Sequence, residues 1–351
     1  MPRTRWHTQI WPTPRVARGK ARNDKANREQ LALKSGGVEE DRTPDLRIAN
    51  AALSQLSYHP SKRSKFYLLG GQAANNVQNH GDIITCLPGD SAMNIKPPYG
   101  YQDIVPLAKT QRVQLQESRK LPAQFRGLSA MPLSFSEFAP AIRDYPAVFI
   151  SGDAGKSLVA MILLGVEAQQ NLFVDANDVW DPAAYLPAYV RRYPFCMTRV
   201  SVNGEEQAER VACVEKTALQ AKGTALFDDK GEPLPVWDGL RKLLFEFEAD
   251  LGRSEEMARK LHELQLFEPF SAQALPNGEQ AITLTGMYRV SEERLHALPA
   301  ETLRELARSG VLARVYLHLL SLGNFQRLLD RRAARRTPEK PATTVNPKKL
   351  N

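Results

Sequence analysis

The sequence predicts an α+β fold, in which a twisted, mostly antiparallel sheet packs against C-terminal helices within a single domain. Short apolar segments of strand length, separated by turn residues, run from about residue 100 to 230 and again from 270 to 290. After Pro235, apolar residues recur at the spacing typical of helices. Because the second group of strands is expected to rejoin the first sheet, we predict one domain over residues 93–330.

The strands of the first group follow from short apolar runs. Pro146–Ile150 and Leu158–Leu164 have the length of buried strands and flank a glycine-containing turn. Asn171–Asp175 is a further expected strand. The alternating segment Met197–Val202 ends at Asn203-Gly204, a dipeptide that favours a hairpin turn.

Most helices are expected after residue 235. Trp237–Leu264 places apolar residues at intervals of three and four, and the break falls before Pro269, because the residue before a proline disfavours the helical conformation. Upstream, Ser136 is positioned to cap a short helix that ends at Arg143. The last helix places five apolar residues on one stripe: Leu312, Val315, Tyr316, Leu319 and Leu320.

The net charge of +8 resides in the two ends of the chain. Residues 1–92 carry 14 basic and 8 acidic residues, and residues 325–351 carry 8 and 2. Residues 93–324 therefore hold 25 basic and 29 acidic residues, a net of −4. A nucleic-acid-binding protein is expected to carry its basic residues on the folded domain, so we expect no nucleic-acid partner. The basic, proline-rich segment 331–351 is expected to be a disordered tail.

Residues 1–92 are polar and show no sustained period of a helix or a strand, so we expect them to be disordered or non-native. Gly37–Lys62 resembles peptides found at the ends of many unrelated predicted bacterial proteins. Gln55–Pro60 can be encoded by the reverse complement of a string that resembles the start of a transfer-RNA gene. Our interpretation is that residues 1–92 are upstream non-coding DNA translated as protein. A genuine disordered extension is the alternative.

This interpretation predicts that translation starts at Met93. Protein purified from the native organism should begin at or near Met93, and a native peptide from upstream of residue 90 would overturn the interpretation. A chain that begins at Met93 should unfold at the same temperature as the full chain, because a segment without a core buries little surface.

No pattern of catalytic or metal-ligating residues stands out. The three cysteines, Cys86, Cys196 and Cys213, contain no CxxC pair, and the three histidines of the body are isolated on predicted helices. We therefore expect no metal, no cofactor and no catalytic residue. Cys196 and Cys213 are expected to be free, partly buried thiols, although adjacent strands would allow one bridge between them.

Gly152–Ser157 imitates the end of a phosphate-binding loop. That motif needs a glycine five positions before Gly155, where the chain has Ile150, and a helix that begins at the Lys-Ser pair. Because Leu158–Leu164 is expected to be a buried strand, we reject a nucleotide site here.

An apolar segment that ends at Asp175 is followed by a polar turn, by Trp180 and by an aromatic and basic segment up to Phe195. This order resembles the SapC family of bacterial proteins, which is named after a surface-layer operon. The resemblance extends over roughly residues 93–330 through further motifs, namely Phe138–Ile150, Leu226-Phe227, Thr285–Val290 and His318–Asn324. It implies a non-enzymatic protein that is associated with the surface layer or envelope, or accessory to it.

The sequence shows neither a secretory signal nor a run of the ~18 apolar residues that a membrane span requires. We therefore expect a cytoplasmic protein without a membrane span, and envelope association rests on the resemblance alone. Its partner, a protein or a small molecule, is left open.

The segment from Trp180 to Tyr193 is the best candidate for a ligand site, and Trp180 is expected to complete its pocket. Tyr185, Tyr189 and Tyr193 recur every four residues and would share one helical face, beside two adjacent arginines. Guanidinium groups bind carboxylates bidentately, and tyrosines offer flat surfaces with a polar tip, so the segment favours a sugar or an acidic peptide as ligand. A binding protein or an unusual enzyme of nutrient uptake is then the alternative function. In the structural alternative, the tyrosines cover the sheet while Arg191 and Arg192 pair with Asp175 or Asp181.

Overall fold

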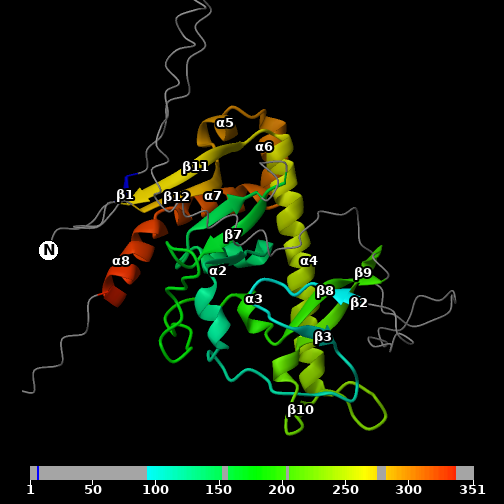
Figure 1. The fold of residues 1–351 in the computed structure, drawn as a ribbon. Coiled ribbons are helices and arrows are strands. Elements are labelled where there is room, and N and C mark those ends of the chain that lie inside the picture. Colours follow the sequence, from blue (N-terminus) through cyan, green and yellow to red (C-terminus); the bar gives the residue numbers. More distant parts are fainter. Residues whose placement is uncertain (1–5, 8–92, 152–156, 203–204, 275–281, 337–351) are drawn as a thin grey trace, which may run out of the picture.

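The computed structural model describes residues 6–7, 93–151, 157–202, 205–274 and 282–336 (Figure 1). Within these residues the strands form three antiparallel sheets, and the helices gather toward the C-terminal half. The predicted α+β class is therefore confirmed.

The main sheet has six strands in the order β1-β11-β12-β6-β7-β5. Met287 and Tyr288 on β12 pair with Ile150 and Phe149 on β6, so the strands near residues 270–290 rejoin the earlier sheet as predicted. The strands are β1 (Trp6–His7), β5 (Ala130–Pro132), β6 (Ala147–Ile150), β7 (Val159–Leu163), β11 (Phe267–Ala274) and β12 (Ile282–Val290).

The remaining strands form separate sheets rather than extending the main one. A four-stranded sheet has the order β2-β8-β9-β3, and β10 pairs with β4 in a two-stranded sheet. Where Phe195–Met197 pairs with Ala212–Val214, the four-stranded sheet is buried on both faces, because Cys196 and Cys213 point into the larger core while Phe195 and Val214 point into a smaller one. These strands are β2 (Met93–Ile95), β3 (Ile104–Pro106), β4 (Arg112–Val113), β8 (Phe195–Val202), β9 (Glu205–Glu215) and β10 (Thr224–Ala225).

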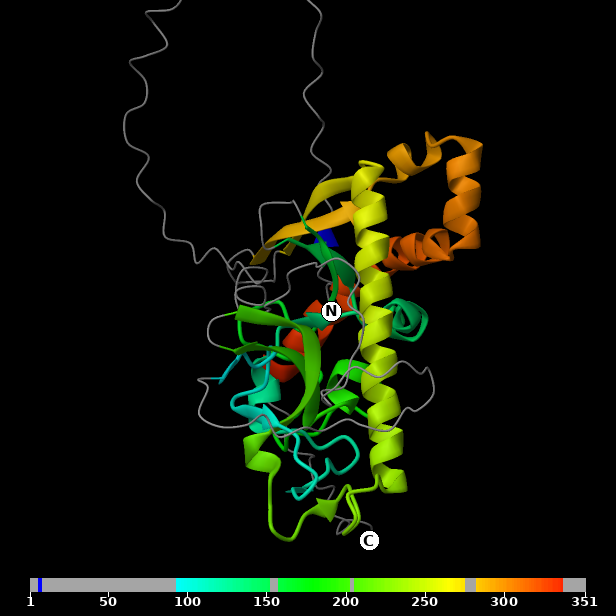
Figure 2. The same cartoon turned by 90° about the vertical axis from the view of Figure 1, so that its right-hand side faces the viewer.

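The long helix α4 (Pro235–Glu263) joins the two cores. It begins at Pro235, since proline suits the first helical position, and runs alongside both larger sheets (Figure 2). Trp237 and Leu244 enter the smaller core, and Leu251 and Leu261 enter the larger one. One element therefore contributes to both cores, as in a single domain.

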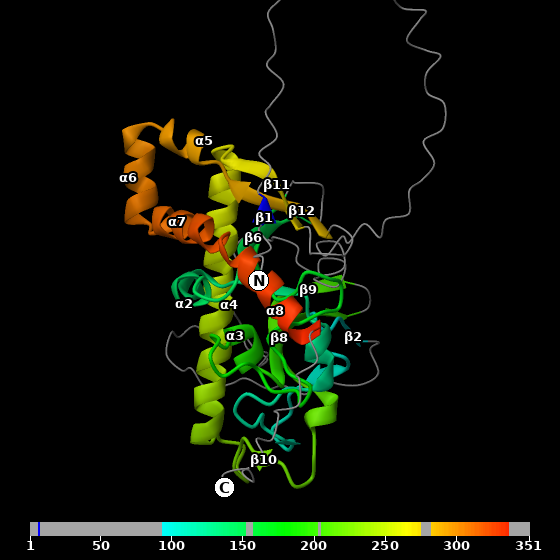
Figure 3. The same ribbon diagram turned by 90° about the vertical axis from the view of Figure 1, so that its left-hand side faces the viewer.

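Shorter helices complete the fold, and α5, α6 and α7 form an arm beside α4 (Figure 3). They are η1 (Ala123–Gly127), η2 (Phe135–Glu137), α2 (Phe138–Ala141), α3 (Ala188–Arg191), η3 (Lys216–Ala218), α5 (Glu292–His296), α6 (Ala300–Arg308), α7 (Val311–Ser321) and α8 (Asn324–Arg336).

Two local predictions are wrong. Asn171–Asp175 is not a strand, because the Asn171 side chain accepts a hydrogen bond from Phe173 N–H at 2.9 Å and turns the chain. Ser136 does not cap the short helix. Its backbone N–H donates to the Asp250 carboxylate at 2.6 Å, and its hydroxyl donates to the same oxygen, so it anchors the helix to α4.

The C-terminal helices also differ from expectation. The predicted stripe on α7 divides, since Val315 is buried while Tyr316 is 45% exposed and Leu320 is 70% exposed. Helix α8 continues to Arg336, past the predicted domain end at residue 330, because its arginines are held by the body of the protein. Arg332, for example, pairs with Glu167 at 2.6 Å. Residues 337–351 lie outside the described part.

Cys196 and Cys213 lie directly opposite each other on β8 and β9, and both are free, buried thiols. Burial raises the pKa of Cys213 to about 12 and that of Cys196 further, so both thiols stay protonated.

The predicted strand after Ser157 is β7, which pairs Val159 with Ile150, so a strand and not a helix follows Ser157. Cys86 and residues 152–156 lie outside the described part.

Among the described helices, none is long and apolar enough to cross a membrane. The described residues also contain no cluster of three or more His, Cys, Asp or Glu side chains arranged to hold a metal ion.

His318 is buried between α7 and the main sheet. Its Nδ1 lies 2.8 Å from the Ala147 carbonyl oxygen, and its Nε2 accepts a hydrogen bond from Val290 N–H at 3.2 Å, an arrangement that fits a neutral ring protonated on Nδ1. Burial lowers the pKa of His318 to about 4. Glu255 on α4 shows the opposite shift, because burial raises its pKa to about 7, and its Oε1 accepts no hydrogen bond from the described residues.

His318 and Glu255 are expected to change stability in opposite directions with pH. As the pH falls from about 6.5 to about 4, the unfolded chain binds a proton at His318 that the folded chain does not, which lowers the free energy of unfolding by about 3 kcal/mol. As the pH rises from about 4.5 to about 7, Glu255 loses its proton in the unfolded chain before it does so in the folded chain. The free energy of unfolding therefore falls over this pH range.

Urea unfolding between about pH 4 and about pH 7 measures both effects. His318→Gln should reduce the loss of stability on the acid side, and Glu255→Gln should reduce the loss near neutral pH. Profiles parallel to that of the parent chain for both variants would contradict these assignments.

Candidate functional site

The aromatic segment does not form one long helix. Only Ala188–Arg191 is helical, because Pro187 immediately precedes this turn and Pro194 follows Tyr193 through a cis peptide bond. Tyr185, Tyr189 and Tyr193 therefore do not share a helical face, which corrects the prediction. The side chains of the segment lie in the larger core, at a buried ion pair on α4 and at the surface.

Trp180 belongs to the larger core. Its ring is fully buried and stacks on Phe173 with ring centroids 6.1 Å apart, and its Nε1 donates to the Tyr185 carbonyl oxygen at 3.2 Å. Tyr145, whose hydroxyl also donates to that oxygen, packs beside it. The structure therefore places Trp180 where it orients the 180–185 loop, away from the surface.

Tyr189 and Tyr193 are also buried. The Tyr189 hydroxyl donates to the Tyr99 carbonyl oxygen at 2.6 Å, and burial raises the pKa of Tyr189 to about 12. Tyr193 packs edge-on against Phe125, with ring centroids 5.4 Å apart. Both rings pack within the protein in this structure.

Arg192 forms a buried ion pair with Glu248 on α4. The guanidinium Nη1 lies 3.1 Å from the carboxylate, with side-chain exposures of 3% and 2%, and Arg210 on β9 binds the other carboxylate oxygen. The guanidinium carbon also lies 4.3 Å from the centre of the Tyr189 ring. The partner expected from the sequence was Asp175 or Asp181, but Asp181 pairs instead with Arg331 of α8, at 2.7 Å.

Tyr185 and Arg191 reach the surface, where they line an open hollow of about 530 Å³. We call it the arginine hollow. Two further arginines line it, Arg119 and Arg143, which come from distant parts of the chain. Its complete lining is Arg119, Arg143, Pro182, Ala183, Ala184, Tyr185, Leu186 and Arg191.

Hydrogen bonds to backbone carbonyl groups hold two of these arginines in place. Arg119 Nη1 donates to the carbonyl oxygens of Asp181 and Ala184, at 2.8 and 3.0 Å, which fixes the loop that forms the wall. Arg191 Nε donates to the Leu186 carbonyl oxygen at 3.2 Å. These hydrogen bonds position Arg119 and Arg191 within the lining of the arginine hollow.

Acidic side chains near the arginine hollow are turned inward. Glu137 is buried and accepts hydrogen bonds from Tyr185 Oη at 2.8 Å and Ala188 N–H at 2.6 Å, and Arg191 Nη2 lies 3.8 Å from it. Asp144 accepts a hydrogen bond from Tyr185 N–H at 2.9 Å. Neither carboxylate belongs to the lining, so the charged residues of the lining are all arginines, one of which, Arg191, also pairs with Glu137.

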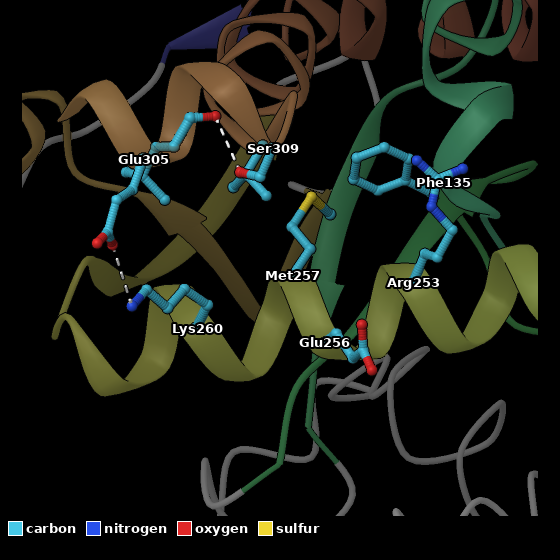
Figure 4. Close-up of a pocket in the computed structure, with 9 residues that line it drawn as sticks. Phe135, Arg253, Glu256, Met257, Lys260, Glu305 and Ser309 are labelled. Carbon is cyan, nitrogen blue, oxygen red and sulfur yellow. Dashed lines mark hydrogen bonds and ion pairs between the residues drawn. The ribbon is translucent and has the colours of Figure 1, made fainter. Parts of the chain in front are cut away.

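A second hollow, of about 290 Å³, lies between α4 and the α6–α7 corner (Figure 4). Its charges are of both signs, and three of the four charged residues of its lining form ion pairs. Lys260 lies 3.8 Å from the Glu305 carboxylate, Arg253 pairs with Asp250 at 3.0 Å, and Arg253 also stacks on Phe135. The arginine hollow, whose charges share one sign, is the better candidate for a ligand site.

The sequence prediction found Tyr185 and Arg191 but missed Arg119 and Arg143. Each is more than 40 positions from Tyr185, and although Arg143 lies within the Phe138–Ile150 motif, nothing in that motif relates it to Tyr185. Only the folding of α2 and of the 180–185 loop brings these residues together.

A comparison with protein-family models matches residues 109–328 to the family described as SapC. The match covers the arginine hollow and α4, while β2 and β3 precede it. No curated protein and no solved structure shows significant similarity to the chain.

The adjacent arginines are expected to differ sharply in their effect on stability. Arg192→Ala leaves the buried Glu248 carboxylate with one partner fewer and should lower the free energy of unfolding by about 3 kcal/mol. Arg191→Ala is the matched control and should cost less than about 1 kcal/mol, because 42% of the Arg191 side chain is exposed. Chemical unfolding of both variants measures the difference, and equal losses would contradict the assignment.

Proposed function

The chain belongs to the SapC family, and from that premise and the chemistry of the arginine hollow we propose that it is a binding protein for an anionic ligand. The ligand class is an acidic peptide or an acidic sugar. The observation that carries the proposal is the convergence of Arg119, Arg143 and Arg191 on one open hollow without a carboxylate in its lining.

The residue types favour recognition of carboxylates. A guanidinium group donates two parallel hydrogen bonds to a carboxylate, and such charge-assisted bonds are stronger than neutral ones. Tyr185 adds a hydroxyl group beside Arg191, at 3.4 Å from its Nη2. The three alanine and proline residues of the wall leave room for the ligand backbone or ring.

The same lining supports binding rather than catalysis. None of the eight residues of the arginine hollow is a histidine, cysteine, aspartate or glutamate, which are common general bases and nucleophiles. Burial and the neighbouring Glu137 raise the pKa of Tyr185, so its phenol stays protonated and acts as a donor. We therefore propose a non-enzymatic role.

Family membership supports an accessory role at the envelope as the setting of this binding, because the family takes its name from a surface-layer operon. In that setting the chain would hold an acidic segment of an envelope component. This part of the proposal rests on membership alone, whereas the anion site rests on the lining residues.

Binding of fluorescently labelled oligoglutamate and of oligogalacturonate tests the proposal. Arg143→Ala and Arg191→Ala should each weaken binding by roughly tenfold or more, the scale of a hydrogen bond to a charged group. Arg259→Ala is the control, since this exposed arginine lies on α4 outside the arginine hollow. Equal binding by all three variants would refute the site and would assign the affinity to general charge.

A further inference from the structure

Helix α7 presents an apolar stripe at the surface. Its inner face is buried through Val315, His318 and Ser321, which pack against the main sheet. On the outer face Tyr316 and Leu320 lie one turn apart and are 45% and 70% exposed. Leu320 is the most exposed of the large apolar side chains in the described part of the chain.

The helix that carries this stripe packs beside α2, and the chain continues from α2 directly to Arg143 of the arginine hollow. Helix α2 lies between α7 and α3 in two perpendicular views (Figures 1 and 3). Asn324, one turn beyond Leu320, donates from its Nδ2 to the Ile142 carbonyl oxygen at 2.6 Å, and Arg327 donates to the Arg143 carbonyl oxygen. Arg143 thus lines the arginine hollow, and its carbonyl oxygen contacts α8, the helix that follows α7.

We propose that the anion site continues from the arginine hollow across α2 onto α7, and that its ligand is an amphipathic acidic peptide segment of a partner protein. Carboxylates of the segment would bind Arg119, Arg143 and Arg191, while its apolar side chains cover Tyr316 and Leu320. This inference rests on the proposed function and narrows the ligand class from acidic molecules to acidic peptides with apolar residues.

Charge favours an acidic peptide over a second copy of the chain or an anionic membrane as the ligand of this surface. A second copy that docked by twofold symmetry would bring the stripe against its own equivalent and would place the arginines at its end near those of the other copy, which like-charge repulsion disfavours. A flat anionic membrane could contact the exposed Arg143 and Arg191, but it is poorly suited to Arg119, which is only partly exposed and is bonded to the loop of the wall. An acidic peptide reaches both surfaces, because it combines carboxylates with apolar side chains along one flexible chain.

Two synthetic peptides of about twelve residues test the proposal. Both carry the same aspartates and glutamates, and one has leucines where the other has serines. Leu320→Ser should weaken binding of the leucine peptide by roughly tenfold while binding of the serine peptide stays unchanged, because only the former buries apolar surface on α7. Val236→Ser, at a partly exposed apolar position that begins α4, is the matched control and should change neither.

The outcomes separate this inference from the proposed function. If Arg143→Ala and Arg191→Ala weaken binding of both peptides but Leu320→Ser weakens neither, the anion site stands and its extension onto α7 is refuted. If the arginine variants have no effect, the proposed function fails as well. If Leu320→Ser only converts a dimer into a monomer in sedimentation, or only removes binding to anionic phospholipid vesicles, a second copy or a membrane covers the stripe and the inference is refuted.

Discussion

The buried carboxylate of Glu248 joins helix α4, the end of α3 and strand β9, and the rest of the structure depends on how these three elements are placed. It lies on α4, the helix that contributes to both cores, and it binds Arg192 at the end of α3 and Arg210 on β9. A charge in this environment is tolerated only when its partners are in place, so the contact also fixes their relative positions. The orientation of α3 follows from it, and with that orientation the outward direction of Arg191.

Much of the fold could be predicted because it depends on local patterns. The periodicity of α4, the paired strands β6 and β7, and the return of β12 to the main sheet all leave clear signals in the sequence. The division of the strands into separate sheets leaves no such signal in the sequence. Where they pair at Phe195–Met197 and Ala212–Val214, β8 and β9 are buried on both faces, and the apolar residues there carry no information about which strands lie beside them.

The candidate site was predictable only in part, for a related reason. Tyrosine, tryptophan and arginine occur both in ligand sites and in cores, where rings stack and guanidinium groups pair with buried acids. Arg191 and Arg192 are neighbours in sequence, yet successive helical residues point in directions about 100° apart, so one faces the surface and the other the interior. The prolines on both sides of α3 were the overlooked signal, because the residue before a proline disfavours the helical conformation, and Leu186 and Tyr193 occupy those positions.

Helix α8 holds the 171–181 loop in place, and this has a consequence for the order of events while the chain is being synthesised. Arg335 donates hydrogen bonds to the carbonyl oxygens of Asn171 and Val174. Arg331 pairs with the Asp181 side chain, and the Asp181 carbonyl oxygen accepts a hydrogen bond from Arg119. The loop that leads into the wall of the arginine hollow is thus held by residues that are synthesised 150 or more positions later. A nascent chain that still lacks α8 contains every arginine of the arginine hollow, but it lacks these contacts to the loop. The wall can therefore reach the arrangement described above only after the C-terminal helix has been synthesised.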